Sequence, residues 1–206
     1  DIATAVKIFE EKFENLVSIH GSKYDRPLSK KDKDAMLASG STIIKCLKMA
    51  PELQDVEVIH NEFPIFEEIG HEHPIKFKGF IDIVLKGKDK RGNTILWIGD
   101  FKTCSWGWDI QKKSAPMTTY QLTYYKQFFS KKHNIPLENI ETHFCLLKRT
   151  AKKNRVEFFR VSSGKKKMEN ANNLLTKAIC SIKNSKHIKN RLSCKGCEFY
   201  KTQHCT

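Results

Sequence analysis

The spacing of apolar residues predicts four helices. In these segments apolar side chains recur every three to four residues, which gathers them on one helical face. Ser29 is suited to cap the second helix, Pro51 ends it, and Thr118 or Thr119 caps the third. The predicted helices are residues 2–19, residues 29–50, a segment containing Leu122, Tyr125, Phe128 and Phe129, and a segment carrying Met168, Ala171, Leu175, Ala178, Ile179 and Ile182.

A different pattern, rich in β-branched and aromatic residues, predicts five strands in the middle of the chain. Residues 95–98 are apolar at every position, which is typical of a central strand covered on both faces. The predicted strands are residues 56–66, 75–85, 94–102, 140–148 and 155–161. Helices and strands in this order predict an α/β fold, a mixed sheet flanked by helices.

The length of 206 residues fits a single domain. It contains no internal repeat, and no linker divides it before about Lys183. We expect an N-terminal helical part at residues 1–50, a core at residues 56–162, and a C-terminal helix with a cysteine-rich tail at residues 165–206.

The chain is strongly basic, because 37 Lys and Arg against 23 Asp and Glu give a net charge of +14. This balance favours a polyanionic partner, although composition does not separate DNA from RNA or an anionic membrane surface. The apolar runs are too short to cross a bilayer, and the first sixteen residues do not resemble a secretory signal. We therefore expect no membrane partner and a cytoplasmic location, or the host cytoplasm if the source is viral. The oligomeric state stays open.

Two aspartates and a lysine stand out within the predicted strands. Asp100 and Lys102 share one face of their strand because side chains alternate along it. Asp82 lies among apolar residues of the preceding strand, where an unpaired carboxylate is costly. Paired carboxylates suit Mg²⁺ or Mn²⁺, and with a neighbouring amine they predict a phosphodiesterase site. The alternative is a plain Asp–Lys ion pair.

Three motifs in order resemble the RecB-like branch of the PD-(D/E)XK nucleases. They are G-x-x-D ending at Asp82, D-x-K at Asp100 and Lys102, and Q-x-x-x-Y at Gln121 and Tyr125, and the resemblance covers residues 56–130. It implies a restriction-endonuclease-like core in which the acids bind Mg²⁺ or Mn²⁺ and the lysine serves catalysis. Gln121 and Tyr125 share a helical face, from which they could reach the substrate or the acids of the site. The alternative is that Gln121 is a surface residue and Tyr125 a core residue.

The resemblance implies a DNA exonuclease in recombination, repair or phage DNA processing. A structure-selective endonuclease, an inactive DNA-binding or scaffold module, and an RNA-directed nuclease are the alternatives. The family also uses an upstream metal ligand, for which Glu62 is the first candidate, with His20 and Glu67 behind it. No P-loop motif is present, so a helicase or recombination protein would be a separate partner.

The seven cysteines do not form a disulfide-like pattern, because three crowd into the last thirteen residues. Cys194 and Cys197 form a C-x₂-C pair that is followed by Cys205, and Cys46 is a candidate fourth ligand. This set resembles the iron–sulfur subgroup of RecB-like nucleases and implies a [4Fe–4S] cluster. A structural zinc with His204 and unligated cysteines are the alternatives.

Two tryptophans follow the D-x-K motif directly. Trp106 and Trp108 either stack on an unpaired base of the substrate or cap the core. Cys104 lies closer to the motif, and we expect it to pack beside the site rather than act as a nucleophile.

Overall fold

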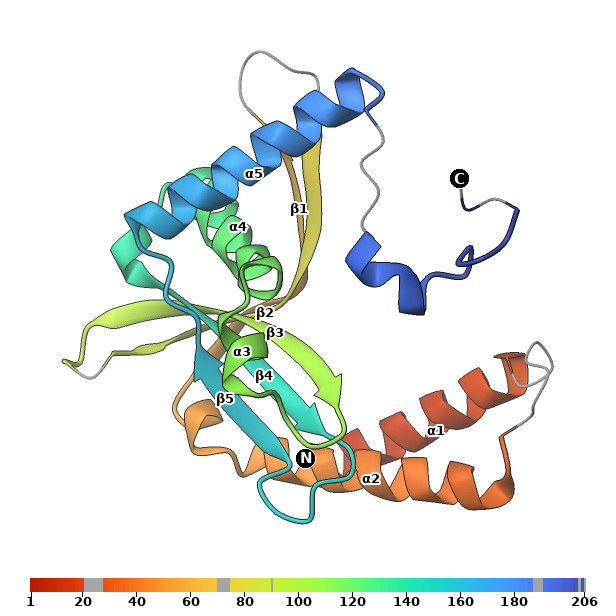
Figure 1. Cartoon of the computed structure of the whole chain (residues 1–206). Helices are drawn as coiled ribbons and strands as arrows, with labels where there is room; N and C mark the ends of the chain where they lie inside the picture. Colours follow the sequence, from red (N-terminus) through yellow and green to blue (C-terminus); the bar gives the residue numbers. More distant parts are fainter. Residues whose placement is uncertain (21–27, 70–74, 90, 187–190, 204, 206) are drawn as a thin grey trace. The chain divides into compact units, whose positions relative to one another are not determined.

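The computed structural model describes residues 1–20, 28–69, 75–89, 91–186, 191–203 and 205. The chain forms two compact units, Asp1–Gly164 and Lys165–Thr206. None of the described helices has the length and apolar content that crossing a bilayer demands. The first unit contains the sheet (Figure 1).

Five strands form one mixed sheet in the order β1-β2-β3-β4-β5. Neighbours pair antiparallel except β3 and β4, which are parallel. A parallel pair needs a crossover, and the helices between β3 and β4 supply it. The strands are β1 (Glu57–Glu68), β2 (Lys76–Lys88), β3 (Thr94–Cys104), β4 (Ile140–Lys148) and β5 (Val156–Arg160). The predicted mixed α/β sheet with flanking helices is confirmed.

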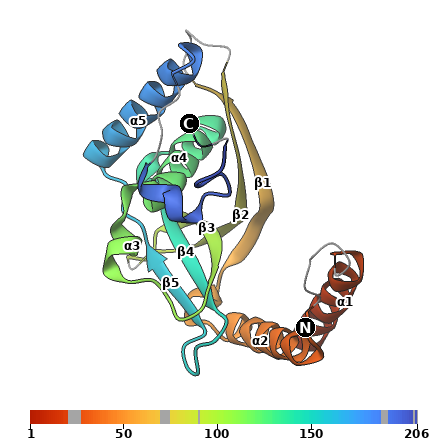
Figure 2. The same cartoon turned by 45° about the vertical axis from the view of Figure 1, so that its right-hand side comes forward.

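The crossover consists of α3 (Ile110–Ser114) and α4 (Pro116–His133), followed by the 3-10 turn η2 (Leu137–Asn139). α4 lies on the concave side of the bent β1–β2 hairpin (Figure 2). It buries one face against the sheet. The buried core cluster comprises Ile65, Ile81, Val84, Ile98, Leu122, Tyr125, Phe129, Ile140, Phe144 and Val161.

The start of α4 differs from the prediction. The helix begins at Pro116 and has no side-chain cap, so neither Thr118 nor Thr119 caps it. Thr119 instead donates its hydroxyl to the carbonyl of Ala115 at 3.1 Å. Proline fits the first helical position because the missing N–H would be unpaired there in any case. The short helix α3, which the apolar pattern did not predict, is capped by Asp109.

Before the sheet, α1 (Ile2–His20) packs against α2 (Lys30–Lys48), and the 3-10 turn η1 (Pro51–Leu53) leads into β1. Ser29 caps α2 as predicted, accepting from the amide of Asp32. Gly40 lies at the helix contact, because a Cβ there would be 2.1 Å from Cζ of Phe9. The glycine that weakens the helical pattern thus permits the close packing.

The second unit contains α5 (Lys165–Lys183) and the 3-10 segment η3 (Arg191–Gly196), followed by turns. α5 is amphipathic, with Ala171 and Ile179 buried. It matches the predicted last helix.

Candidate active site

The two aspartates meet where the β2–β3 ladder ends. The last backbone pair of this ladder is Ile83 with Gly99, so Asp82 and Asp100 occupy the next step of the same register. There the side chain of Asp82 replaces the backbone as acceptor: its Oδ2 lies 2.6 Å from the amide nitrogen of Phe101. A Cβ on Gly99 would lie 2.8 Å from Cγ2 of Ile83, so glycine keeps the strands close just before they part.

Asp100 is almost completely buried, with 1% of its surface exposed. Its Oδ1 accepts a hydrogen bond from Nε2 of Gln121 at 2.7 Å. Nζ of Lys102 lies 2.7 Å from Oδ2, an ion pair, although Oδ2 accepts no well-aligned hydrogen bond among the described residues. Burial raises the pKa of Asp100 and the charge of Asp82 adds to this, while Lys102 opposes both. Because burial disfavours its charged form, the carboxylate would be stabilised by a further cation.

The Q-x-x-x-Y motif reaches the acids from α4. Nε2 of Gln121 lies near both Oδ1 of Asp100 and the hydroxyl of Tyr125, the latter at 3.2 Å. Tyr125 is 5% exposed and belongs to the core cluster, so it is a core residue that also contacts the site residue Gln121. Gln121 is not a simple surface residue, because its amide orients the buried carboxylate.

Gly79 makes room for this arrangement. A Cβ at Gly79 would lie 2.7 Å from Cε1 of Tyr125 and 3.3 Å from its hydroxyl oxygen. The glycine of G-x-x-D and the tyrosine of Q-x-x-x-Y are therefore in direct contact. Three motifs separated in sequence form one packed arrangement.

The candidate upstream ligands do not join the two aspartates. Glu62 is exposed on β1, and its φ of +49° interrupts the pairing opposite Asp82. Glu67 instead pairs with Nζ of Lys132 at 2.9 Å. His20 ends α1, and its side chain lies outside the described residues. Across the part of the chain that the structure describes, no three His, Cys, Asp or Glu side chains gather as a ligand set.

The two tryptophans after β3 have different environments. Trp108 packs edge-on against Phe144 and Phe159, with ring centroids 5.4 and 6.0 Å apart, and Nζ of Lys112 lies 4.7 Å from its ring. Trp106 is 70% exposed. Trp108 thus caps the core, whereas Trp106 is available to a partner. Cys104 is half-buried on β3.

A charged group that the sequence does not predict lies on the same sheet face. Glu157 accepts from Nζ of Lys113 and lies 2.7 Å from Nζ of Lys148, and both lysines lower the pKa of its carboxyl against the opposing effect of burial. These residues come from β5, α3 and β4. Only tertiary structure brings them together, so no spacing in the sequence signals them.

The cysteine ligand set is divided between the two units. Cys46 lies on α2 in the first unit, while the other three belong to the second. Cys194 is half-buried, and Cys197 and Cys205 are exposed. The amide of Cys197 donates to the carbonyl of Cys194 at 3.1 Å, which keeps the C-x₂-C pair within one turn. His204 lies outside the described residues.

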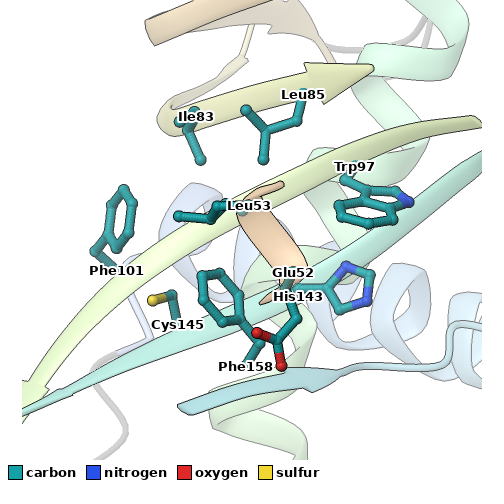
Figure 3. A pocket seen from close by; sticks show the side chains of 10 residues that line it. Glu52, Leu53, Ile83, Leu85, Trp97, Phe101, His143, Cys145 and Phe158 are labelled. Carbon is teal, nitrogen blue, oxygen red and sulfur yellow. The ribbon is translucent and has the colours of Figure 1, made fainter. Parts of the chain in front are cut away.

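A pocket lies on the other face of the sheet. Its walls include Ile83 and Leu85 from β2, Trp97 and Phe101 from β3, and Leu53 from η1 (Figure 3). His143 and Cys145 also line it. Side chains alternate along β3, so Phe101 points into this pocket while Asp100 and Lys102 point to the α4 side. The apolar pocket is therefore separate from the acidic pair.

Neither family models nor curated proteins match this sequence. Among solved structures, an inferred exonuclease from Eubacterium rectale matches with a TM-score of 0.52 and 11% identity, over 94% of this chain and 71% of that one. A protein named SSO0001 matches with a TM-score of 0.45 and 13% identity, over 95% and 78% of the two chains, and is too distant to support an inference. The first likeness shows that the chain shares a fold with a protein regarded as an exonuclease.

Proposed function

We propose that this chain is a Mg²⁺- or Mn²⁺-dependent DNA nuclease of the PD-(D/E)XK type that hydrolyses phosphodiester bonds. The observation that carries the proposal is the buried Asp100, which lies beside Asp82 and is contacted by both Lys102 and Gln121. A simple ion pair would not need a second carboxylate and an orienting amide. The fold, shared with an inferred exonuclease, is compatible with this reading.

The residues fit a hard divalent cation. Asp82 and Asp100 offer carboxylate oxygens, the ligand type that Mg²⁺ and Mn²⁺ prefer, and Mg²⁺ usually keeps several waters. Oδ2 of Asp100 has no well-aligned hydrogen-bond donor among the described residues. When bound there, a divalent ion supplies Lewis-acid polarisation of a phosphate and lowers the pKa of a water.

The chain's own side chains divide the remaining tasks. Gln121 fixes the orientation of Asp100 through its 2.7 Å hydrogen bond. The side chain of Lys102 is one-third exposed, so its ammonium can contact a phosphate while it remains beside Asp100. There it offsets the negative charge that develops during hydrolysis, or it orients the attacking water.

Replacement of Asp100 tests the proposal. Asp100→Asn removes one charged ligand and should lower cleavage of linear DNA by at least about a hundredfold, while DNA binding persists. The matched control is Asp55→Asn, because Asp55 is exposed and its φ of +57° suits asparagine equally well. Unchanged cleavage by Asp100→Asn would refute the assignment. Binding without cleavage by the unaltered chain, with either metal, would support the inactive DNA-binding module.

We further propose that the enzyme acts as an exonuclease. Linear and covalently closed circular DNA of the same sequence separate the two modes of cleavage. Degradation of the linear form alone supports an exonuclease, while cutting of closed circles supports the structure-selective endonuclease. A matching RNA tests the RNA-directed alternative.

For the cysteine tail, we propose a [4Fe–4S] cluster held by Cys46, Cys194, Cys197 and Cys205. The support is the one-turn C-x₂-C pair and the half-buried Cys46 and Cys194. Such a cluster would have a structural role and would take no part in hydrolysis. Anaerobic purification followed by metal analysis tests it: four irons per chain support the cluster, and one zinc supports the alternative metal.

A further inference from the structure

Trp106 is exposed on a loop whose backbone is fixed. The carbonyl of Ser105 accepts from both the amide and the hydroxyl of Thr150, at 3.1 and 2.8 Å. The carbonyl of Cys104 accepts from the amide of Arg149 at 2.8 Å. These hydrogen bonds hold the loop against the β4–β5 connection, and the indole remains 70% exposed. A large apolar ring presented from a held backbone is suited to contacting a flat ligand.

Charged side chains lie close to Gly107, the residue that follows Trp106. Gly107 follows Trp106, and a Cβ on it would lie 3.7 Å from Cδ of Lys148 and 3.8 Å from Oε2 of Glu157. Lys148 is 9% exposed and shares Glu157 with Lys113. Two ammonium groups thus surround one carboxylate, which leaves one positive charge uncompensated within the set.

Lys148 and Glu157 lie on the same face of the sheet as Asp100. The registers align Lys102 with Leu146 and Leu146 with Glu157, and they align Cys104 with Lys148. Lys148 is therefore two residues further along the sheet than Lys102. At about 3.3 Å per residue this is a shift of about 6.6 Å, comparable with one nucleotide step along an extended strand.

We propose that Trp106, Lys113 and Lys148 form a subsite for one unpaired nucleotide of single-stranded DNA, next to the scissile phosphate. The base stacks on the indole of Trp106, and the adjoining phosphate contacts the ammonium groups. A base inside a duplex already has stacked neighbours on both faces, so this subsite selects single-stranded or frayed ends. The inference rests on the proposed nuclease function and specifies its substrate.

Binding of an oligothymidylate tests the stacking. The measurement uses the full chain carrying Asp100→Asn, which prevents degradation during titration. Stacking on an aromatic side chain is worth about 1–3 kcal/mol per base, so adding Trp106→Ala should weaken binding at least about fivefold. Trp106→Phe should retain most of the affinity. Met49→Ala is the control, because Met49 is 76% exposed and apolar but belongs to neither site.

Intrinsic fluorescence gives a second readout. The chain has three tryptophans, and Trp97 and Trp108 are only partly exposed. Base stacking should quench the emission of Trp106, and the change should disappear in Trp106→Ala. The stacking contact would be overturned if the chain bound the oligothymidylate equally well with and without Trp106→Ala. It would also be overturned if the quenching persisted in Trp106→Ala.

The phosphate contact is tested by salt dependence and by a charge change of the opposite sign. Lys113→Gln should reduce the slope of log affinity against log salt by about 0.7, the value for one contact to a single strand. Glu157→Gln removes the competing carboxylate and should strengthen binding. If Lys113, Lys148 and Glu157 only stabilise the fold, both variants should lower the melting temperature and leave the salt slope and the affinity unchanged. That result would refute the phosphate contact.

Failure of the subsite and failure of the nuclease proposal give different results. If the chain cleaves DNA but prefers duplex ends, and Trp106→Ala leaves its affinity for single-stranded DNA unchanged, the subsite is wrong and the nuclease assignment stands. If Asp100→Asn cleaves as well as the unaltered chain, the nuclease assignment is wrong, whatever Trp106 does.

Discussion

Asp100 shows how one buried side chain depends on its neighbours. The carboxylate is held by the amide of Gln121 on one oxygen and by the ammonium of Lys102 on the other. Groups that orient a metal ligand are commonly worth 10- to 100-fold in metal affinity or activity. We therefore propose that Gln121 acts through Asp100 as a positioning residue.

Replacing Gln121 tests this role. Gln121→Ala should raise the Mg²⁺ or Mn²⁺ concentration required for half-maximal cleavage by about tenfold or more, because Asp100 loses its orienting donor. Saturating metal should restore part of the rate. The control is Gln54→Ala, since the side-chain amide of Gln54 donates to backbone carbonyls near η1, away from the two aspartates. An unchanged metal requirement would contradict the role.

His143 lies on the face of the sheet opposite to the two aspartates, and it should make the stability of the fold depend on pH. Burial, and to a lesser degree the charge of Arg160, lowers its pKa from 6.5 to about 4. The ring is therefore neutral at pH 7, and its 3.7 Å approach to Glu141 is not an ion pair there. Between these values the unfolded chain binds the proton more readily, so the free energy of unfolding falls as the pH drops from 6.5 to 4.

The expected loss is at most about 3.5 kcal/mol, since each pKa unit corresponds to about 1.4 kcal/mol. His143→Leu should remove this part of the dependence. Denaturant unfolding of both proteins at pH 7 and pH 4.5 measures it. Equal losses in the two proteins would show that other groups cause the acid sensitivity.

At the scale of elements, the site depends on how closely α4 approaches β2. Gly79 permits Tyr125 to lie over the strand, because a Cβ would overlap its ring. Gly79→Ala should displace Tyr125 and with it Gln121. Overpacking of this kind typically costs about 1–3 kcal/mol. Gly164→Ala is the control, since no described atom lies within 4 Å of its Cβ position. Chemical unfolding and cleavage assays together measure the effect; normal stability and activity in Gly79→Ala would contradict it.

The strands and the acid pair could be predicted because local patterns determine them. Asp82 and Asp100 belong to neighbouring strands of one hairpin, so alternation and register suffice to bring them together. The position of Glu62 could not be predicted, because its left-handed backbone conformation leaves no trace in the apolar pattern. Likewise, α3 is too short to show periodicity. The pairing of Glu157 with two lysines depends on the crossover and on the edge strand.

At the scale of the whole molecule, a net charge of +14 favours the binding of a polyanion, and the two carboxylates of the site repel it locally. A divalent cation bound there would neutralise the two carboxylate charges and so would connect metal loading with substrate affinity. Phosphate contacts make such affinity depend steeply on salt.

Removing metal tests this link. EDTA should abolish cleavage, and Mg²⁺ or Mn²⁺ should restore it. Without metal, DNA binding should weaken in the unaltered chain more than in Asp100→Asn, which carries one negative charge fewer at the site. A melting curve with EDTA provides the control for folding. Cleavage that continues with EDTA would contradict a metal-dependent mechanism.

The parallel pairing of β3 with β4 also has a consequence for refolding. The acids meet when a local hairpin closes, whereas Gln121 arrives only after the crossover through α3 and α4 brings β4 into place. Contacts between distant parts of a chain form more slowly than local ones. During refolding from denaturant we therefore expect the two carboxylates to acquire cation affinity before the protein becomes catalytically competent, with a delay set by closure of the crossover.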